Sequence, residues 1–390
     1  MSNSRPRHQP ASRLADPWID TLNRRADALR QRGARIISLG QAVPGFLPPP
    51  AAIAAAIRAT ESGDVHAYTG DAGLGELRDA VAEWLRHIAG GVIDPDAGLI
   101  ITAGANQAFA IAALTALGAG DDVLLASPYF FNHEMMVRAT GATPIEVALD
   151  SGAGFSLDAD RITDALTPRT RAVVVVSPAN PTGAVARPES IQSLAATLGD
   201  RGILLVVDET YLLFAYDSTP WTATSLTAYD NIVVIGSFSK AFAIPGWRLG
   251  YLAASRPFIG EAMKVQDAMI ICAPAASQYG VMAALTFDPL YPRQFIPEFR
   301  QRREVLKRAI DASGGEWTPT GGGFFALARF PGCEDSFAAA RRLLDEAHVL
   351  TIPGALFGRA GEGFLRLSYG AASVEELEVA LRRVKVCLNG

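Results

Sequence analysis

The pattern of apolar and polar positions predicts a parallel sheet in the middle of the chain. Short continuous apolar runs occur at 98–102, 122–126, 171–176, 203–207 and 231–236, and helical segments such as 105–117 and 187–198 lie between several of them. Apolar strands that alternate with helices are typical of a mostly parallel sheet covered by helices on both faces. We therefore predict an α/β fold organised around this sheet.

The segment before this sheet has a different pattern. Apolar residues recur at helical spacing over residues 17–32 and again over 74–88, which predicts two amphipathic helices. The stretch from Gly40 to Pro50 is rich in glycine and proline, so it is expected to be irregular.

The chain changes character again after about residue 285. Here we expect a long helix near 292–313 that leads to the segment GGGFFALARF, then a helix near 335–347, a strand at 364–368 and a terminal helix at 373–387. These elements form a smaller α+β unit. We predict a large domain at 46–285 and a small domain from 1–45 and 286–390, with the first dozen residues disordered.

Composition narrows the kind of partner. The chain has 390 residues, of which 49% are hydrophobic, and a net charge of −5. No broad basic field is available to bind nucleic acid or an anionic membrane, so a small-molecule partner is expected. The longest apolar runs suit buried strands and are too short to cross a bilayer.

The cysteines and the N-terminus indicate a cytoplasmic protein. Cys272, Cys333 and Cys387 are far apart and odd in number, and they match neither a disulfide framework nor a zinc-binding spacing. The polar N-terminus lacks the apolar core of a signal peptide. We expect no metal site.

Reactive side chains follow two of the predicted strands directly. Asp208 and Tyr211 follow one apolar run, and Ser237, Ser239 and Lys240 follow another. Ligands of open α/β sheets bind beyond the carboxyl ends of the strands. A carboxylate at such an edge needs a cationic partner, although a helix cap or an internal salt bridge would also explain Asp208. A lysine whose amine is kept neutral can form Schiff bases.

Other strand ends carry groups suited to binding an anion. Gly104, Ala105 and Asn106 lie where a strand passes into a helix, and the N-terminus of a helix attracts phosphate. Arg248 follows Lys240 by eight residues, among hydroxyls and glycines, which together resemble a phosphate cup. Asn180 lies in an NPTG segment, which is also a strong signal for a plain turn.

Taken together, these motifs resemble those of a known family. The NPTG, VVDETY and SFSKAFAIPGWRLGY blocks are highly specific in combination, and the resemblance extends from about residue 36 to 385. The chain resembles the fold-type I enzymes that depend on pyridoxal 5′-phosphate (PLP), and within them the aspartate aminotransferase-like class I/II aminotransferases. The resemblance implies the PLP-transferase fold, with a mostly parallel seven-stranded sheet between helices and a smaller α+β domain.

The resemblance also implies roles for the cofactor site. Lys240 would carry PLP as an aldimine and transfer the proton, Asp208 would pair with the pyridine nitrogen, and Phe130 would stack on the ring unless it is a core residue. Tyr211 and Asn180 would hydrogen-bond the phenolic oxygen. Gly104, Ala105, Asn106, Ser237, Ser239 and Arg248 would surround the phosphate.

A third set of implied roles concerns the substrate and the partner subunit. Arg366 would bind the α-carboxylate of the substrate, because a guanidinium and a carboxylate form a bidentate pair, although a structural ion pair is the alternative. Gly40 and Asn180 would line the substrate site. Tyr68 would reach a phosphate across the interface of a homodimer. Ala42 and Gly45 depart from the family's usual residues, which leaves the substrate side chain open.

The resemblance implies transfer of an amino group between an α-amino acid and a 2-oxo acid. Elimination or cyclisation of a hydroxylated basic amino acid, as in capreomycidine synthase, is the alternative, because both reactions begin at the same carbanion. Two other functions are disfavoured. A non-enzymatic PLP sensor would need a further domain before residue 36, and a Rossmann dehydrogenase would need a GxGxxG motif after the first strand.

Overall fold

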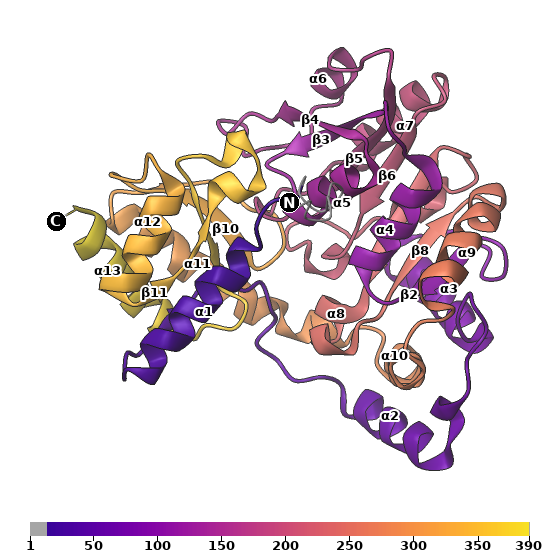
Figure 1. Cartoon of the computed structure of the whole chain (residues 1–390). Coiled ribbons are helices and arrows are strands. Elements are labelled where there is room, and N and C mark those ends of the chain that lie inside the picture. The colour runs from indigo at the N-terminus through magenta and orange to yellow at the C-terminus, as the bar shows by residue number, and fades with distance from the viewer. Residues whose placement is uncertain (1–13, 390) are drawn as a thin grey trace, which may run out of the picture.

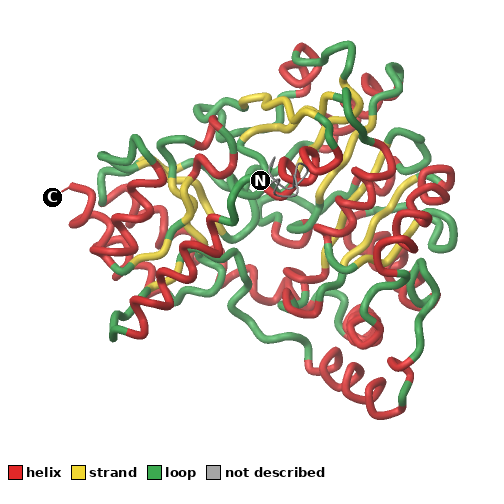
Figure 2. Tube along the Cα trace, in the orientation of Figure 1, coloured by secondary structure: helices red, strands yellow, loops and turns green. Residues whose placement is uncertain are grey.

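A seven-stranded sheet forms the centre of the larger part of the molecule (Figures 1 and 2). The computed structural model describes residues 14–389; the first dozen residues, predicted to be disordered, lie outside this range. The strand order is β2 (Leu99–Thr102), β8 (Gly250–Ala254), β7 (Ile232–Ser237), β6 (Leu204–Asp208), β5 (Thr170–Val176), β3 (Asp122–Ser127) and β4 (Thr143–Ala148). Only β8 runs antiparallel to its neighbours in this sheet. The predicted mostly parallel sheet is confirmed.

Helices cover both faces of this sheet because successive strand residues point to opposite sides. On one face, alternate strand residues pack with α3 (Gly75–Ala89), α6 (Ala159–Asp164), α7 (Pro188–Gly199) and α10 (Ala275–Phe287). On the other face they pack with α4 (Ala105–Ala116), α5 (Phe131–Thr140) and α9 (Arg256–Ile270). The strands are therefore buried on both sides, as their continuous apolar sequences require.

The C-terminal region forms a second, smaller unit with its own apolar core. Its antiparallel sheet has the order β12 (Ile352–Pro353), β13 (Leu365–Ser368), β10 (Phe325–Arg329) and β9 (Glu316–Trp317), and β1 (Ile37–Ser38) pairs separately with β11 (Val349–Leu350). The helices here are α11 (Ile296–Ala312), α12 (Ser336–Arg342), the π-helical turn η7 (Leu343–Ala347) and α13 (Val374–Asn389). They lie together at one side of the large sheet in Figure 1.

The N-terminal segment joins the two units. Helix α1 (Trp18–Gln31) packs through Leu22 and Ala26 on Leu344 and Ile352 of the smaller unit. An irregular stretch, as predicted, then leads to α2 (Pro50–Ser62), which lies beside α10 at the lower edge of Figure 1.

Short helices complete the chain. They are η2 (Asp64–His66), η3 (Leu212–Phe214), η4 (Ala223–Leu226), α8 (Phe238–Ala241), η5 (Pro245–Trp247), η6 (Tyr291–Phe295), η8 (Gly354–Phe357) and η9 (Arg359–Gly361). Within residues 14–389, no helix combines the length and the apolar character needed to cross a membrane.

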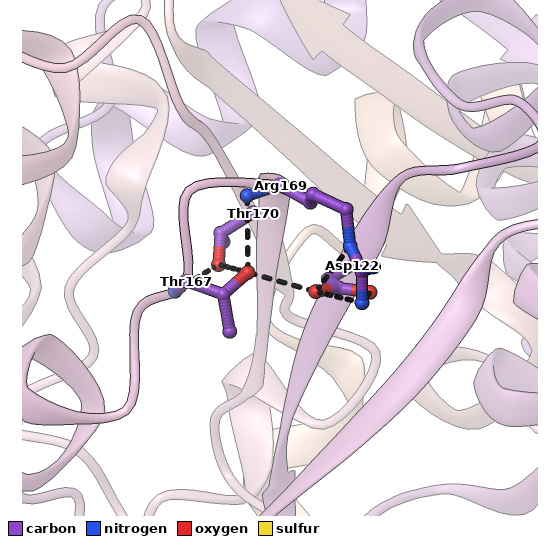
Figure 3. Close-up of polar contacts among 4 residues, drawn as sticks. All are labelled: Asp122, Thr167, Arg169 and Thr170. Atoms are coloured by element: carbon purple, nitrogen blue, oxygen red, sulfur yellow. Dashed lines mark hydrogen bonds and ion pairs between the residues drawn. The ribbon is translucent and has the colours of Figure 1, made fainter.

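The two ends of the large sheet differ in chemistry. At the end where β3 and β5 begin, Asp122 is buried and accepts hydrogen bonds from Thr167 and Arg169, as Figure 3 shows. Thr170 in turn accepts from the backbone N–H of Thr167. This cluster ties the chain that precedes β5 to the first residue of β3.

Candidate active site

A cavity of about 400 Å³ opens at the other end of the sheet, where the parallel strands finish. Such a volume is typical of sites for small molecules and cofactors. All the predicted site residues except Gly104 and Tyr68 line it: Gly40, Ala105, Asn106, Phe130, Asn180, Asp208, Tyr211, Ser237, Ser239, Lys240, Arg248 and Arg366. Segments that are hundreds of residues apart in the sequence therefore meet in one place.

Lys240 extends into this cavity from α8, directly after β7. Its Nζ donates a hydrogen bond to the carbonyl oxygen of Ala42 at 2.7 Å. Burial, and to a smaller extent the positive charges of Arg366 and Arg248, together lower the pKa of Lys240 to about 8. The amine is therefore partly neutral near physiological pH, which is the form that reacts with carbonyl groups.

Asp208 ends β6 and lies buried at the floor of the cavity. Its Oδ1 accepts from the backbone N–H of Thr210 at 2.9 Å, and its Oδ2 lies 3.1 Å from Nε2 of His133. Burial alone would raise the pKa of Asp208, but the hydrogen bonds from His133 and Thr210 outweigh it and hold the pKa below its usual value. Asp208 is therefore an ionised carboxylate in a nearly water-free setting.

Arg366 lies in β13 and is a buried cation with spare hydrogen-bonding capacity. Its Nη1 donates to Oδ1 of Asn180 at 3.1 Å and its Nη2 donates to the carbonyl oxygen of Gly40. Its Nε has no partner among the described residues, and no carboxylate there pairs with it. Burial lowers its pKa to about 10. The structural ion pair that was the alternative explanation is thus absent within residues 14–389.

The start of α4 provides a further concentration of donors. Gly104, with φ +87°, precedes the helix, and a Cβ atom there would lie 2.5 Å from Nη2 of Arg248. The Arg248 guanidinium donates to the carbonyl oxygen of Pro245 at 2.8 Å, and Ser237 and Ser239 line the cavity nearby. A helix N-terminus, hydroxyls and a guanidinium are together suited to a phosphate group.

Comparison with known proteins identifies the family. The family model for "Aminotransferase class I and II" matches residues 34–384, nearly the whole chain. The chain belongs to the class I and II aminotransferases. Enzymes of this family use PLP and act on amino acids and 2-oxo acids, so the predicted PLP-dependent aminotransferase is confirmed.

Individual aminotransferases resemble the chain over its whole length. It is 35% identical to the aspartate/prephenate aminotransferase of Thermus thermophilus over 93% of both chains, and 32% identical to aromatic-amino-acid aminotransferase 2 of Thermococcus litoralis over 91% of this chain and 92% of that protein. The solved structure of aspartate aminotransferase from Thermus thermophilus with maleate superposes with a TM-score of 0.91, at 32% identity, over 98% of this chain and 100% of that one. The fold predicted from the sequence is confirmed.

The residues present fit the cofactor of an aminotransferase. An aldehyde needs an amine that can be neutral, a protonated ring nitrogen needs a carboxylate, and a phosphate needs donors and positive charge. Lys240, Asp208 and the α4 end with Arg248 meet these requirements around one cavity. Nε of Arg366, which has no partner among the described residues, can donate a hydrogen bond to one further anion.

Sequence reasoning missed several residues of this aminotransferase site. His133 is buried between the rings of Phe109 and Phe130, at 4.2 and 5.4 Å, and bonds Asp208. It lies in the segment SPYFFNH, three residues after Phe130, and this spacing on a helix was the available signal. Ile19, Gln41, Val43, Phe131 and Thr210 also line the cavity and were not predicted.

Tyr68 lies outside the cavity. It is 78% exposed, in the segment between η2 and α3. Nothing in a single chain places it near Lys240 or Arg248.

Proposed function

We propose that this aminotransferase holds PLP at Lys240 and binds the α-carboxylate of an amino acid at Arg366. One observation carries this assignment: a buried guanidinium without an anionic partner among the described residues faces the same cavity as a lysine of lowered pKa. A buried cation is costly unless it is paired. A substrate carboxylate would provide the missing partner through a bidentate contact.

The other predicted residues would hold the cofactor. Ala105, Asn106, Ser237, Ser239 and Arg248 would bind its phosphate, with Gly104 leaving space for the Arg248 side chain. Asp208 would pair with the ring nitrogen, Tyr211 and Asn180 would bond the phenolic oxygen, and Phe130 would stack on the ring. The low pKa of Asp208 supports its part, because an ionised carboxylate favours a protonated nitrogen.

When bound, PLP supplies an electron sink for the charge that remains after a proton leaves the α-carbon. The protein's own residues do the rest. Arg366 and Asn180 orient the substrate through its carboxylate, since Asn180 Oδ1 already holds one guanidinium nitrogen in place. Lys240, whose amine can be neutral, moves the proton from the α-carbon. His133 keeps Asp208 in position and ionised.

We also propose that the active form is a homodimer to which Tyr68 contributes across the interface. In support, Tyr68 is exposed, and so are three apolar residues that precede it in the sequence, Leu47, Ile53 and Ile57, at 80%, 40% and 52%. Sedimentation of the purified protein tests the dimer. Tyr68→Phe should weaken PLP binding without changing the mass of the particle.

We further propose the two domains and the cytoplasmic location that were predicted from the sequence. The domain boundaries at 45/46 and 285/286 are supported by the two main apolar clusters. One lies within residues 52–285, and the other consists mostly of residues 296–388 with Ile37 and Leu39, joined by Tyr211, Phe214 and Tyr216. A cytoplasmic location is supported by the three cysteines, which are all free.

Borohydride reduction followed by peptide mapping tests the assignment of Lys240. Reduction of the enzyme with PLP should fix the cofactor on Lys240, and Lys240→Ala should lose both the label and all transamination. Lys264→Ala is a matched control, because Lys264 pairs with Glu261 on an exposed helix. A label on any other lysine would overturn the assignment.

A half-reaction with single amino acids tests the reaction type. Each productive amino acid should yield one equivalent of its 2-oxo acid per site and no free ammonia. Repeated release of ammonia or water without a 2-oxo acceptor would instead indicate elimination or cyclisation.

A further inference from the structure

The cations around the cavity are already assigned to other tasks. Among the described residues, the cationic side chains of the lining are Lys240, Arg248 and Arg366. In the proposed function they take the cofactor aldehyde, the phosphate and the α-carboxylate. Within one protomer, no further positive charge among residues 14–389 lines the cavity to receive a second carboxylate on a substrate.

The remaining wall near Arg366 is apolar. Ile19 of α1 and Phe131 at the start of α5 both line the cavity, and both pack on the apolar cluster that contains Phe357. The rings of Phe131 and Phe357 lie 5.7 Å apart, and Cζ of Arg366 lies 5.3 Å from the Phe357 ring. The apolar wall therefore adjoins the guanidinium that would hold the substrate.

The neutral polar side chains of the lining do not change this picture. Gln41 and Thr210 line the cavity without a charge, and Ala42 and Val43 add apolar surface. A carboxylate placed against Ile19 and Phe131 would lose its water without gaining a charged partner, which is unfavourable. An aliphatic or aromatic side chain there would instead remove apolar surface from water.

We propose that Ile19 and Phe131 form a side-chain subsite that selects amino acids with apolar side chains, aliphatic or aromatic, over aspartate and glutamate. The selection rests on the proposed function, because Arg366 must hold the α-carboxylate for the side chain to reach this wall. It also makes α1, a helix of the smaller unit, a determinant of specificity.

Binding of unreactive carboxylates to the PLP-loaded enzyme tests the subsite without turnover. Calorimetry should show 3-phenylpropanoate and 4-methylpentanoate binding at least about tenfold more tightly than succinate or maleate. Tighter binding of the dicarboxylates would overturn the subsite and leave the role of Arg366 intact. Failure of every carboxylate to bind would overturn the role of Arg366 and the subsite with it.

A pair of charge-insertion variants locates the subsite. Ile19→Arg should weaken 3-phenylpropanoate and strengthen succinate, each by about tenfold or more, because it supplies the missing cation. Thr21→Arg adds the same charge at an exposed position of the same helix and should change neither affinity. A folded Ile19→Arg enzyme with unchanged preference would contradict the proposal.

A third variant covers the case in which Ile19→Arg does not fold. Phe131→Ala should weaken 3-phenylpropanoate by about tenfold while leaving succinate unchanged, because it removes apolar contact and no charge. Equal losses for both ligands would contradict an apolar subsite.

Discussion

Buried charged groups lie at both ends of the large sheet, but they differ in whether all their hydrogen bonds are made within the chain. At the end where β3 and β5 begin, both oxygens of Asp122 are occupied by Thr167 and Arg169 of the same chain (Figure 3). At the end where the strands finish, Nε of Arg366 and Nδ1 of His133 have no partner among the described residues. A buried charge whose bonds are all filled holds the fold together, whereas one with free bonds is available to a ligand.

Paired arginine substitutions give the largest expected contrast between the two ends. Arg366→Ala should lower kcat/KM at least about a hundredfold, because the substrate carboxylate would lose a buried, charged partner. Arg169→Ala should leave kcat/KM unchanged and lower the free energy of unfolding by no more than about 1 kcal/mol, since its side chain is 70% exposed and screened by water.

Steady-state kinetics and urea unfolding of the two variants measure this contrast. A large loss of activity in Arg169→Ala, or a pure loss of stability in Arg366→Ala, would show that the division between the two ends is wrong.

The pH dependence of cofactor capture probes the charges at the active-site end. The pKa of Lys240 is lowered to about 8, so the neutral amine increases as the pH rises and is fully formed above that value. Capture of PLP by the cofactor-free enzyme should therefore slow by about tenfold for each pH unit below 8. Borohydride trapping and mass spectrometry at pH 6 to 10 measure the rate.

The same experiment has an internal control. Arg366→Ala removes a positive charge that lowers the pKa of Lys240, so the inflection should move upward. An inflection at the usual lysine value of 10.5 in the wild type would contradict the effect of burial.

Glu209 is a buried acid whose hydrogen bonds are made within the protein, and it lies next to Asp208 of the active site. It follows Asp208, but its carboxyl accepts from the Ala223 N–H at 2.6 Å and contacts the Thr222 hydroxyl at 2.6 Å. Burial raises its pKa to about 8, against the effect of these hydrogen bonds. The folded state therefore keeps a proton that the unfolded chain loses near 4.5, and this acid's contribution to stability falls as the pH rises from about 4.5 to 8.

Glu209→Gln should remove that pH dependence and leave kcat/KM unchanged. Urea unfolding at pH 5.5, 7 and 8.5 should show the variant gaining stability relative to the wild type with each step. A constant difference across this range would indicate that Glu209 is ionised in the folded protein.

Thr167→Val gives a small expected effect, on stability alone. It keeps the shape of the side chain but removes the hydroxyl, which donates to the buried Asp122 at 2.7 Å and also contacts the Thr170 hydroxyl and the Arg169 backbone N–H. The free energy of unfolding should therefore fall by about 1 to 2 kcal/mol. Thr163→Val is the matched control, because the Thr163 hydroxyl bonds only a helix carbonyl. Equal losses in the two variants would mean that the Asp122 cluster adds no stability of its own.

The residues at strand ends were predictable from the sequence. Apolar runs identify β6 and β7, and parallel strands finish at the same edge, so Asp208 and Lys240 had to lie near each other. The strands β4 and β8 were not among the predicted runs. The sequence of β4, Thr143–Ala148, includes a proline and a glutamate. The sequence of β8, Gly250–Ala254, is short and consists partly of small residues, so neither segment stands out as a buried strand.

The apolar side of the cavity could not be predicted in the same way. Ile19 belongs to an amphipathic helix whose pattern indicates which face is buried but not what it is buried against. Its place beside Phe131 depends on how α1 packs on Phe357, more than 300 residues later in the chain. The role of His133 likewise follows only from its contact with Asp208, which the structure shows.

The carbonyl groups of Gly40 and Ala42 already accept hydrogen bonds from Arg366 and Lys240. The irregular segment between β1 and α2 thus acts as a built-in competitor for both cations. A carboxylate that forms a bidentate pair with Arg366, or an aldehyde that reacts with Lys240, competes with these carbonyl groups. A measured affinity at this site is consequently the difference between two sets of hydrogen bonds, and changes in residues 40–42 should tune binding without touching the ligand.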